Sequence, residues 1–221
     1  DYVLGESLRS ILPFGPLVVT EGPCGYWRDA GYKTSTDGTN DILEAHKDFG
    51  HGIVGVVHGQ FDEKDGMMNA STHLVPEDTT HVFMVDSDEV WRKRDIEKII
   101  ELLEGGGYDS MGFTADSFFG GFDYILGGFE RDFEVIRIQR WYKGARWATH
   151  RPPTVLSPLG QPWATQRHLG AKETLRLGIT MPHYSYVFPS QVAMKHTYYS
   201  CLLYTSPSPR DLSTSRMQSS A

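Results

Sequence analysis

The feature that most constrains this chain is an apolar run that ends abruptly in acids. Residues 82–85 read VFMV and continue directly into DSDE at 86–89. An unbroken apolar run is typical of a strand buried on both faces, as in the parallel sheets of α/β proteins. Such sheets bind ligands at the carboxyl ends of their strands, which is where Asp86 and Asp88 fall. The run therefore predicts a ligand site at the edge of a buried sheet.

Two carboxylates this close together need a neutralising partner, because each raises the pKa of the other. A divalent cation is one solution. Mg²⁺ and Mn²⁺ prefer oxygen ligands, take one or two carboxylates, and complete their coordination with water and phosphate oxygens. The alternative is a solvated acidic loop that caps the following helix, since acids favour helix N-termini. The buried strand that leads into Asp86 favours a metal and diphosphate site.

Helical and strand patterns alternate over the first hundred residues. Helical patterns cover 2–12, 39–50, 64–75 and 95–104, and short apolar strands cover 16–21, 52–57 and 81–85. This alternation predicts an α/β fold with a doubly wound, mostly parallel sheet. Such a sheet normally opens with a strand, so we expect its first strand to precede Asp1. From residue 105 the sequence alternates like antiparallel strands, which predicts an antiparallel extension that lines a pocket.

Composition narrows the range of partners. The chain has 221 residues, of which 39% are hydrophobic, enough for one domain with a full core. A net charge of −7 without a basic stripe argues against nucleic acid as a partner. No apolar run reaches the roughly 18–20 residues that span a bilayer, so no transmembrane segment is expected. We expect a cytoplasmic protein, or one peripheral at the inner face of the membrane.

The last residues differ from the rest of the chain in composition. CLLYTSPSPRD at 201–211 and SRMQSSA at 215–221 resemble the translation of a transposase-type sequencing adapter. The alternative is a genuine disordered tail rich in Ser and Pro. We therefore expect 201–221 to be a non-native disordered tail and exclude it from the fold.

A series of landmarks in the first half resembles the glycosyltransferases of the GT-A fold, family 2 in particular. In order, they are a helix like YVLGESLRSIL, a strand ending VVTEG, the motif STDGT, a helix with Lys and Asn, and DSDE followed by Trp and a helix. They span about residues 2–104. RIQRWYKGARWATHRPPT and HYSYVFPSQVAMK are similar to the acceptor half of this family.

The resemblance implies an inverting enzyme that moves a sugar from a nucleoside diphosphate donor to an acceptor hydroxyl, with Mn²⁺ or Mg²⁺ as cofactor. It implies a nucleotide-sugar-binding half at 1–104 and an acceptor-side half of the same domain at 105–200. A glycan, a lipid-linked glycan or a protein would be the acceptor.

The resemblance also assigns residues to the donor. Glu21 would bind the base or ribose, and Asp37 would lie near the nucleoside. Lys64 and Asn69 would face the nucleotide sugar, and Asp86 would lie at the diphosphate. Each has a plain structural alternative, as a turn acid, a helix cap or an exposed polar side chain.

Metal ligands and a catalytic base complete the assignment. The cation would bind Asp86 and Asp88, the latter more directly. Many members of this fold add a later histidine, for which His183 is our choice and His150 the rival. A carboxylate must take the proton of the acceptor hydroxyl, and the candidates are Asp132 first and Glu130 second.

Other protein classes share parts of this pattern. Phosphatases of the haloacid dehalogenase class also end an apolar strand in D-x-D, with Asp86 as nucleophile and Asp88 as acid/base. They usually place the motif on the first strand and need a later acidic pair held by glycine, which is not seen here. A nucleotidyltransferase would need a Gly/Arg-rich phosphate loop near its start. A non-catalytic sugar-binding module remains a further alternative.

Overall fold

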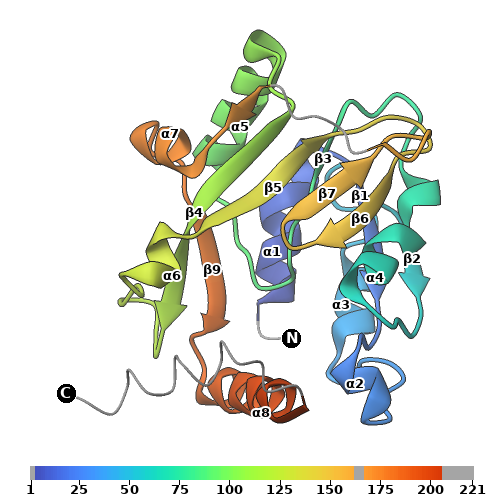
Figure 1. The fold of residues 1–221 in the computed structure, drawn as a ribbon, viewed down its shortest axis with the longest axis vertical. Helices are drawn as coiled ribbons and strands as arrows, with labels where there is room; N and C mark the ends of the chain where they lie inside the picture. The colour runs from blue at the N-terminus through green and yellow to red at the C-terminus, as the bar shows by residue number, and fades with distance from the viewer. Residues whose placement is uncertain (1–2, 162–166, 206–221) are drawn as a thin grey trace.

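The structure, a computed structural model, describes residues 3–161 and 167–205 (Figure 1). The helices and 3₁₀ turns are α1 (Leu4–Ile11), η1 (Leu12–Phe14), α2 (Tyr26–Asp29), α3 (Thr39–Ala45), α4 (Lys64–Ala70), η2 (Thr72–Leu74), α5 (Lys93–Gly106), α6 (Phe129–Asp132), α7 (Ala171–Arg176) and α8 (Pro189–Thr205). The strands are β1 (Leu17–Glu21), β2 (Ile53–His58), β3 (His81–Phe83), β4 (Ser110–Phe119), β5 (Glu134–Arg140), β6 (Arg146–His150), β7 (Pro153–Leu156), β8 (His168–Leu169) and β9 (Met181–Tyr186).

The strands pair both in parallel and antiparallel. β1 pairs in parallel with β2, whereas β3 pairs antiparallel with β5. β4 lies between β5, its antiparallel partner, and β8, its parallel partner, and β9 also pairs in parallel with β4. β6 and β7 form a separate antiparallel hairpin. The expected α/β fold with an antiparallel extension is thus present.

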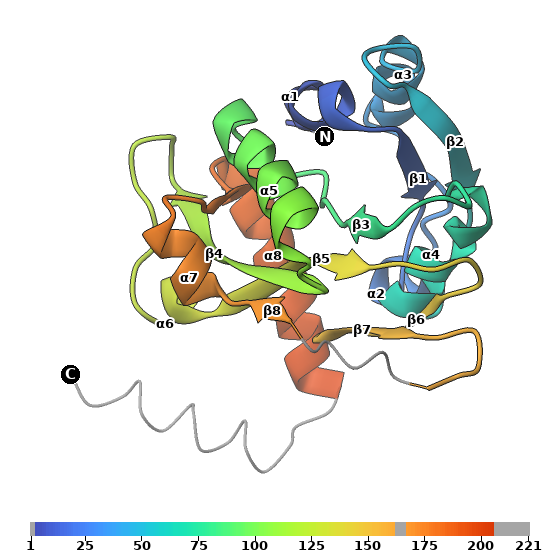
Figure 2. The same cartoon turned by 90° about the horizontal axis from the view of Figure 1, so that it is seen from above.

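The strand arrangement differs from one doubly wound, mostly parallel sheet. Among the described strands, β1 and β2 form a sheet of their own, and β3 belongs to the larger sheet (Figure 2). The reason is the choice of partner: β3 takes its hydrogen bonds from β5, a strand that returns antiparallel from the second half. The expectation of a strand before Asp1 stays a prediction.

Apolar stripes hold the layers together. In α1, Leu4 and Leu8 are buried and pack with Leu12 and Leu43 in a cluster that contacts the β1–β2 sheet. A larger cluster joins α5 to the central sheet, and its fully buried members include Ile99, Phe113, Ile138 and Met181. α5 ends where Gly107 adopts a left-handed conformation with φ of +62°, which glycine adopts without steric cost.

The C-terminal helix reaches beyond the expected boundary of the tail. α8 continues to Thr205, so residues 201–205 are helical. The remainder of the expected tail, 206–221, lies outside the described residues. The division of the chain at 104 and 105 falls at the end of α5, between the alternating helices and strands and the aromatic-rich strands (Figure 1).

Candidate functional site

The acids after β3 lie where three strands end. β3 and β4 both run antiparallel to β5, and β9 runs parallel to β4, so β3, β4 and β9 share one direction. The backbone N–H of Met84 donates to the Arg137 carbonyl at 2.8 Å, which extends the β3–β5 pairing toward Asp86. Polar side chains from three strands therefore gather at one carboxyl edge, the usual ligand-binding edge of such a sheet.

Asp86 is held by two basic side chains. Arg137 Nη2 donates to its Oδ2 at 2.6 Å, and Lys64 Nζ lies 3.5 Å from its Oδ1. Loss of hydration alone would raise the pKa of Asp86, but the charges of Arg137 and Lys64 hold that pKa well below its usual value. The side chain is 41% exposed. Asp86 is therefore an ionised carboxylate with one side open to solvent.

Glu89 lies beneath Asp86 and is fully buried. Its carboxylate forms an ion pair with Arg137 and accepts a hydrogen bond from Trp91 Nε1 at 3.1 Å. Burial pushes the pKa of Glu89 upward, and the charge of Arg137 opposes that shift and favours the ionised form. Arg137, only 14% exposed, thus links the buried acid to the exposed one. Through Arg137, the buried Glu89 therefore helps to fix the position of the Asp86 carboxylate.

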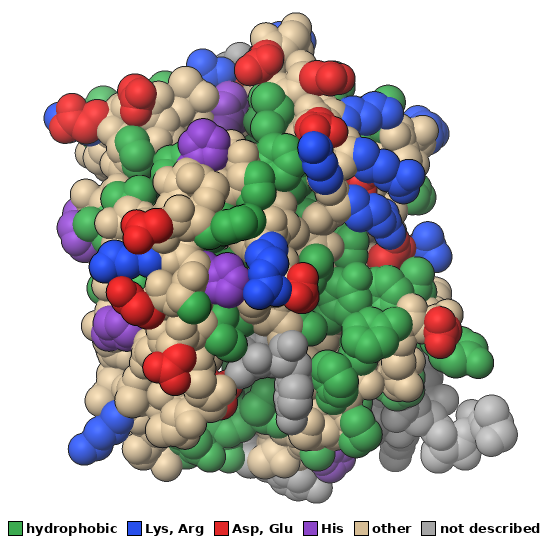
Figure 3. Space-filling model, turned by 180° about the vertical axis from the view of Figure 1, so that it is seen from behind, with side chains coloured by type: hydrophobic (Ala, Val, Ile, Leu, Met, Phe, Trp, Pro, Cys, Tyr) green, Lys and Arg blue, Asp and Glu red, His purple; other side chains and the backbone are tan. Residues whose placement is uncertain are grey.

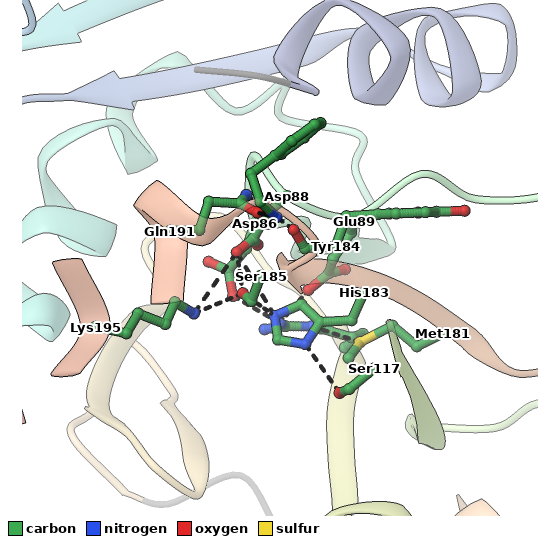
Figure 4. A network of polar contacts seen from close by, with 12 residues as sticks. Asp86, Asp88, Glu89, Ser117, Met181, His183, Tyr184, Ser185, Gln191 and Lys195 are labelled. Carbon is green, nitrogen blue, oxygen red and sulfur yellow. Dashed lines mark hydrogen bonds and ion pairs between the residues drawn. The ribbon is translucent and has the colours of Figure 1, made fainter. Parts of the chain in front are cut away.

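Asp88 is positioned by backbone pairing with β9. Tyr184 N donates to the Asp88 carbonyl at 2.8 Å, and Glu89 and His183 form an isolated antiparallel bridge. This pairing directs the Asp88 carboxylate toward β9 and α8 (Figure 4). There it accepts a hydrogen bond from Ser185 Oγ, and its Oδ2 lies 3.6 Å from His183 Nε2.

His183 lies between two serine hydroxyls. Ser117 Oγ is 3.1 Å from its Nδ1, and Ser185 Oγ is 2.7 Å from its Nε2. Burial lowers the pKa of His183 more than Asp88 raises it, which favours a neutral imidazole. The single proton of the Ser185 hydroxyl is donated to Asp88, so in this network His183 Nε2–H donates to Ser185 Oγ and His183 Nδ1 accepts from Ser117 Oγ. A neutral imidazole beside a carboxylate is a chemically suitable metal ligand in the tautomer that leaves the coordinating nitrogen without a proton.

Comparison with known proteins identifies the family. The profile described as Glycosyl transferase family 2 matches residues 34–151, more than half of the chain. The chain belongs to glycosyl transferase family 2. No curated protein and no solved structure matches it significantly. The match contains the DSDE segment and supports a GT-A-type domain. It selects the glycosyltransferase interpretation over the phosphatase and nucleotidyltransferase alternatives.

This glycosyltransferase domain brings together the residues expected at the metal. Asp86, Asp88 and His183 lie in one network (Figure 4). The rival His150 ends β6, and no contact joins it to Asp86 or Asp88 in the described part of the chain. Within residues 3–161 and 167–205, no group of three or more His, Cys, Asp or Glu side chains is arranged so that it could hold a metal ion.

The two acids expected near the nucleoside contact the chain itself. Glu21 is buried at the end of β1, where it accepts hydrogen bonds from Ser35 N at 3.0 Å and Thr34 Oγ1 at 3.4 Å. His58 Nδ1 lies 2.9 Å from the same carboxylate. Asp37 accepts a hydrogen bond from Thr39 Oγ1 at 2.7 Å, at the start of α3. Glu21 therefore anchors the segment that leads into STDGT.

The two polar residues expected on α4 have different surroundings. Lys64, the first residue of α4, points at Asp86, the residue expected at the diphosphate. Asn69 instead clamps β6: its Nδ2 donates to the Trp147 carbonyl and its Oδ1 accepts from Trp147 N, each at 2.8 Å. Both polar atoms of the Asn69 amide are thus used in joining α4 to β6.

The two candidate bases lie on α6. Arg131 of this helix pairs with the buried Asp116 of β4 at 3.3 Å, which holds α6 against the strand. Asp132 is exposed, and none of its described contacts reaches Asp86 or Asp88. The side chain of Glu130 lies outside the described residues.

Three residues of the network did not emerge from the sequence. Arg137, Ser185 and Lys195 all contact the acids after β3. Arg137 lies in a strand, EVIRIQR, that holds other charged and polar residues, so the sequence does not distinguish it. Ser185 follows His183 by two positions, so both side chains face the same side of β9.

An open pocket adjoins the network. Its volume is about 600 Å³, and its lining is mostly apolar: Gly120, Tyr186, Val187, Pro189, Val192, Ala193, His196 and Thr197. Exposed aromatic side chains, including Phe122 and Tyr124, follow β4 nearby, and the ring of Phe122 lies 6.1 Å from that of Phe188. Apolar side chains gather at the lower right of the face in Figure 3.

Proposed function

We propose that this chain is a metal-dependent, inverting glycosyltransferase that moves a sugar from a nucleoside diphosphate donor to an acceptor hydroxyl. The observation that carries the proposal is the meeting of Asp88 and His183, 3.6 Å apart, beside the ionised Asp86 at the carboxyl ends of β3, β4 and β9. Family membership implies a nucleotide-sugar donor and an acceptor.

The residues present suit a divalent ion by their chemistry. Asp88 and His183 would hold Mn²⁺ or Mg²⁺, with Asp86 alongside, through a carboxylate oxygen and a neutral imidazole nitrogen. Such ions keep several positions for water and substrate phosphates, so a complete protein cage is not required. Bound there, the ion would supply Lewis-acid stabilisation of the charge on the departing diphosphate.

The surrounding side chains would orient the donor. Arg137 and Glu89 fix the Asp86 carboxylate from below, and Lys64 lies on its exposed side, where it would bind phosphate or sugar oxygens. Of the residues assigned to the donor, Lys64 has the best supporting contacts. Glu21 and Asn69 would act through the segments they anchor, and Asp37 through the start of α3.

The candidate bases for the acceptor hydroxyl lie on α6. A carboxylate there, Asp132 first and Glu130 second, would take the proton of the attacking hydroxyl. Attack from the face opposite the leaving diphosphate would invert the anomeric centre without a covalent intermediate. The acceptor would be a glycan, a lipid-linked glycan or a protein. The reaction would take place in the cytoplasm or at the inner membrane face.

A non-catalytic sugar-binding module is the second candidate. The observation that favours it is the engagement of Asp86 by Arg137 and Lys64, which leaves Asp88 and His183 as the two expected metal ligands that face each other. This candidate would bind the donor without breaking its glycosidic bond.

Donor turnover tests the proposal. A panel of UDP-, GDP- and dTDP-sugars is incubated with the protein and Mn²⁺, and release of the nucleoside diphosphate is measured by chromatography. We expect release from one donor class, its loss in EDTA, and a loss of at least about a hundredfold in Asp88→Ala. Asp48→Ala, which removes an exposed aspartate between α3 and β2, is the matched control. Donor binding without release would support the non-catalytic module and contradict the proposal.

A further inference from the structure

Lys195 contributes to the site from α8, a helix that lies outside residues 34–151, the part of the chain that matches the family. It lies on α8, and its ammonium donates to Ser185 Oγ at 2.5 Å. The same ammonium lies 3.9 Å from Asp88 Oδ2 (Figure 4). It also lies 4.8 Å from the centre of the Tyr186 ring. A hydroxyl and an aromatic face are good partners for a cation. Lys195 is thus directed at Asp88 by several contacts.

The placement of Lys195 conflicts with a metal at Asp88 unless an anion is also present. A divalent ion on the Asp88 carboxylate would set two cationic groups on the same acid, and they would repel strongly at such short distances. Asp86 offers little relief, because Arg137 and Lys64 already neutralise it. An anion that contacts both the metal and the ammonium removes the repulsion.

The chemistry of that anion follows from the charges. The three basic groups Lys64, Arg137 and Lys195 are balanced by three acids, Asp86, Asp88 and Glu89, so a divalent ion leaves the surroundings positive. A diphosphate carries two or more negative charges and offers several oxygens, enough for a metal and an ammonium together. The Lys195 side chain is 26% exposed, which leaves it accessible to such a ligand.

We propose that Lys195 is a binding residue for the diphosphate of the nucleotide-sugar donor. The inference rests on the proposed function. Its ammonium contacts phosphate oxygens from the α8 side, while Lys64 approaches from α4. Held by Ser185 and Tyr186, the ammonium balances charge on the diphosphate as the glycosidic bond breaks. α8 is then part of the donor site.

The test separates metal binding from diphosphate binding. Mn²⁺ alone, and then UDP or GDP in the presence of Mn²⁺, are titrated by calorimetry into wild-type protein and Lys195→Met. We expect the nucleoside diphosphate to bind about 10- to 100-fold more weakly to the variant, the effect of losing a charged hydrogen bond. Mn²⁺ alone should bind no more weakly, because the variant removes a positive charge beside Asp88. Lys195→Arg should retain most of the affinity.

Lys172→Met on α7 is the matched control, because Lys172 is exposed and lies on a helix that supplies no side chain to the network. Equal nucleoside diphosphate affinity in Lys195→Met and Lys172→Met would overturn the inference. A parallel loss of Mn²⁺ affinity would also overturn it, since it would indicate a structural role for Lys195. If wild-type protein binds no nucleoside diphosphate with Mn²⁺, the proposed function itself fails, and this inference fails with it.

Discussion

At the scale of single residues, buried charges determine which acids are available to a ligand. Glu89 is fully buried and depends on Arg137 and Trp91, whereas Asp86 and Asp88 are partly exposed. The DSDE segment thus divides into one buried supporting acid and two partly exposed acids. Removing one partner of a buried ion pair typically costs about 3–5 kcal/mol of folding stability. Arg137, the partner of the buried Glu89, therefore has a structural role in the site.

Glu21 gives a prediction about pH. Burial alone would raise the pKa of Glu21, but hydrogen bonds from Ser35 and His58 lower it below the usual 4.5. A lowered folded-state pKa means that the ionised form stabilises the fold above pH 4.5, and that this contribution is lost as the pH falls further. At pH 7, Glu21→Gln should therefore lower the free energy of unfolding by about 2 kcal/mol.

Urea denaturation at several pH values checks this prediction. The deficit of Glu21→Gln should shrink as the pH falls below 4.5. Glu44→Gln, which changes an exposed glutamate on α3, should behave like the wild type throughout. A deficit that stays constant down to pH 3 would show that the charge of Glu21 does not stabilise the fold.

At the scale of helices and strands, the sequence predicts local structure better than partners. The VFMV run, the stripe of α1 and the glycine stop of α5 each identify an element, because their patterns lie within a few residues. The pairing of β3 with β5 joins residues far apart in the chain, and no local pattern encodes it. For the same reason the contacts of Arg137 and Lys195 with the acids could not be predicted, whereas the position of Asp86 and Asp88 just after a strand could.

Asn69 was expected to face the nucleotide sugar, but its side chain instead makes a contact between two secondary-structure elements. Its amide joins α4 to β6 through both backbone groups of Trp147. Asn69→Asp would keep the acceptor for Trp147 N but would set a carboxylate oxygen against the Trp147 carbonyl. We expect the free energy of unfolding to fall by about 2 kcal/mol or more, measured by chemical denaturation.

Asn40→Asp, which makes the same change at an exposed position of α3, should alter stability by less than about 0.5 kcal/mol. If Asn69→Asp were as stable as this control but bound donor more weakly, Asn69 would belong to the donor site after all.

At the scale of the whole molecule, the site joins the two halves of the domain. Asp86 and Asp88 come from the first half, and Arg137, His183 and Lys195 come from the second. The open apolar pocket lies beyond Tyr186, on the α8 side of the network. Among the described residues, no helix has the length and apolar character needed to cross a membrane. Because the residues of the network come from both halves, both are needed to assemble the proposed donor site.

Binding of Mn²⁺ tests the central claim most directly. Electron paramagnetic resonance of Mn²⁺ titrated with protein and nucleoside diphosphate reports the fraction of bound ion without requiring turnover. The wild type and the Asp48→Ala control should bind Mn²⁺ alike, and Asp88→Ala and His183→Ala should each bind it more than about tenfold more weakly while keeping the wild-type melting temperature. Unchanged Mn²⁺ binding in both of these variants would contradict a metal site at the ends of β3 and β9.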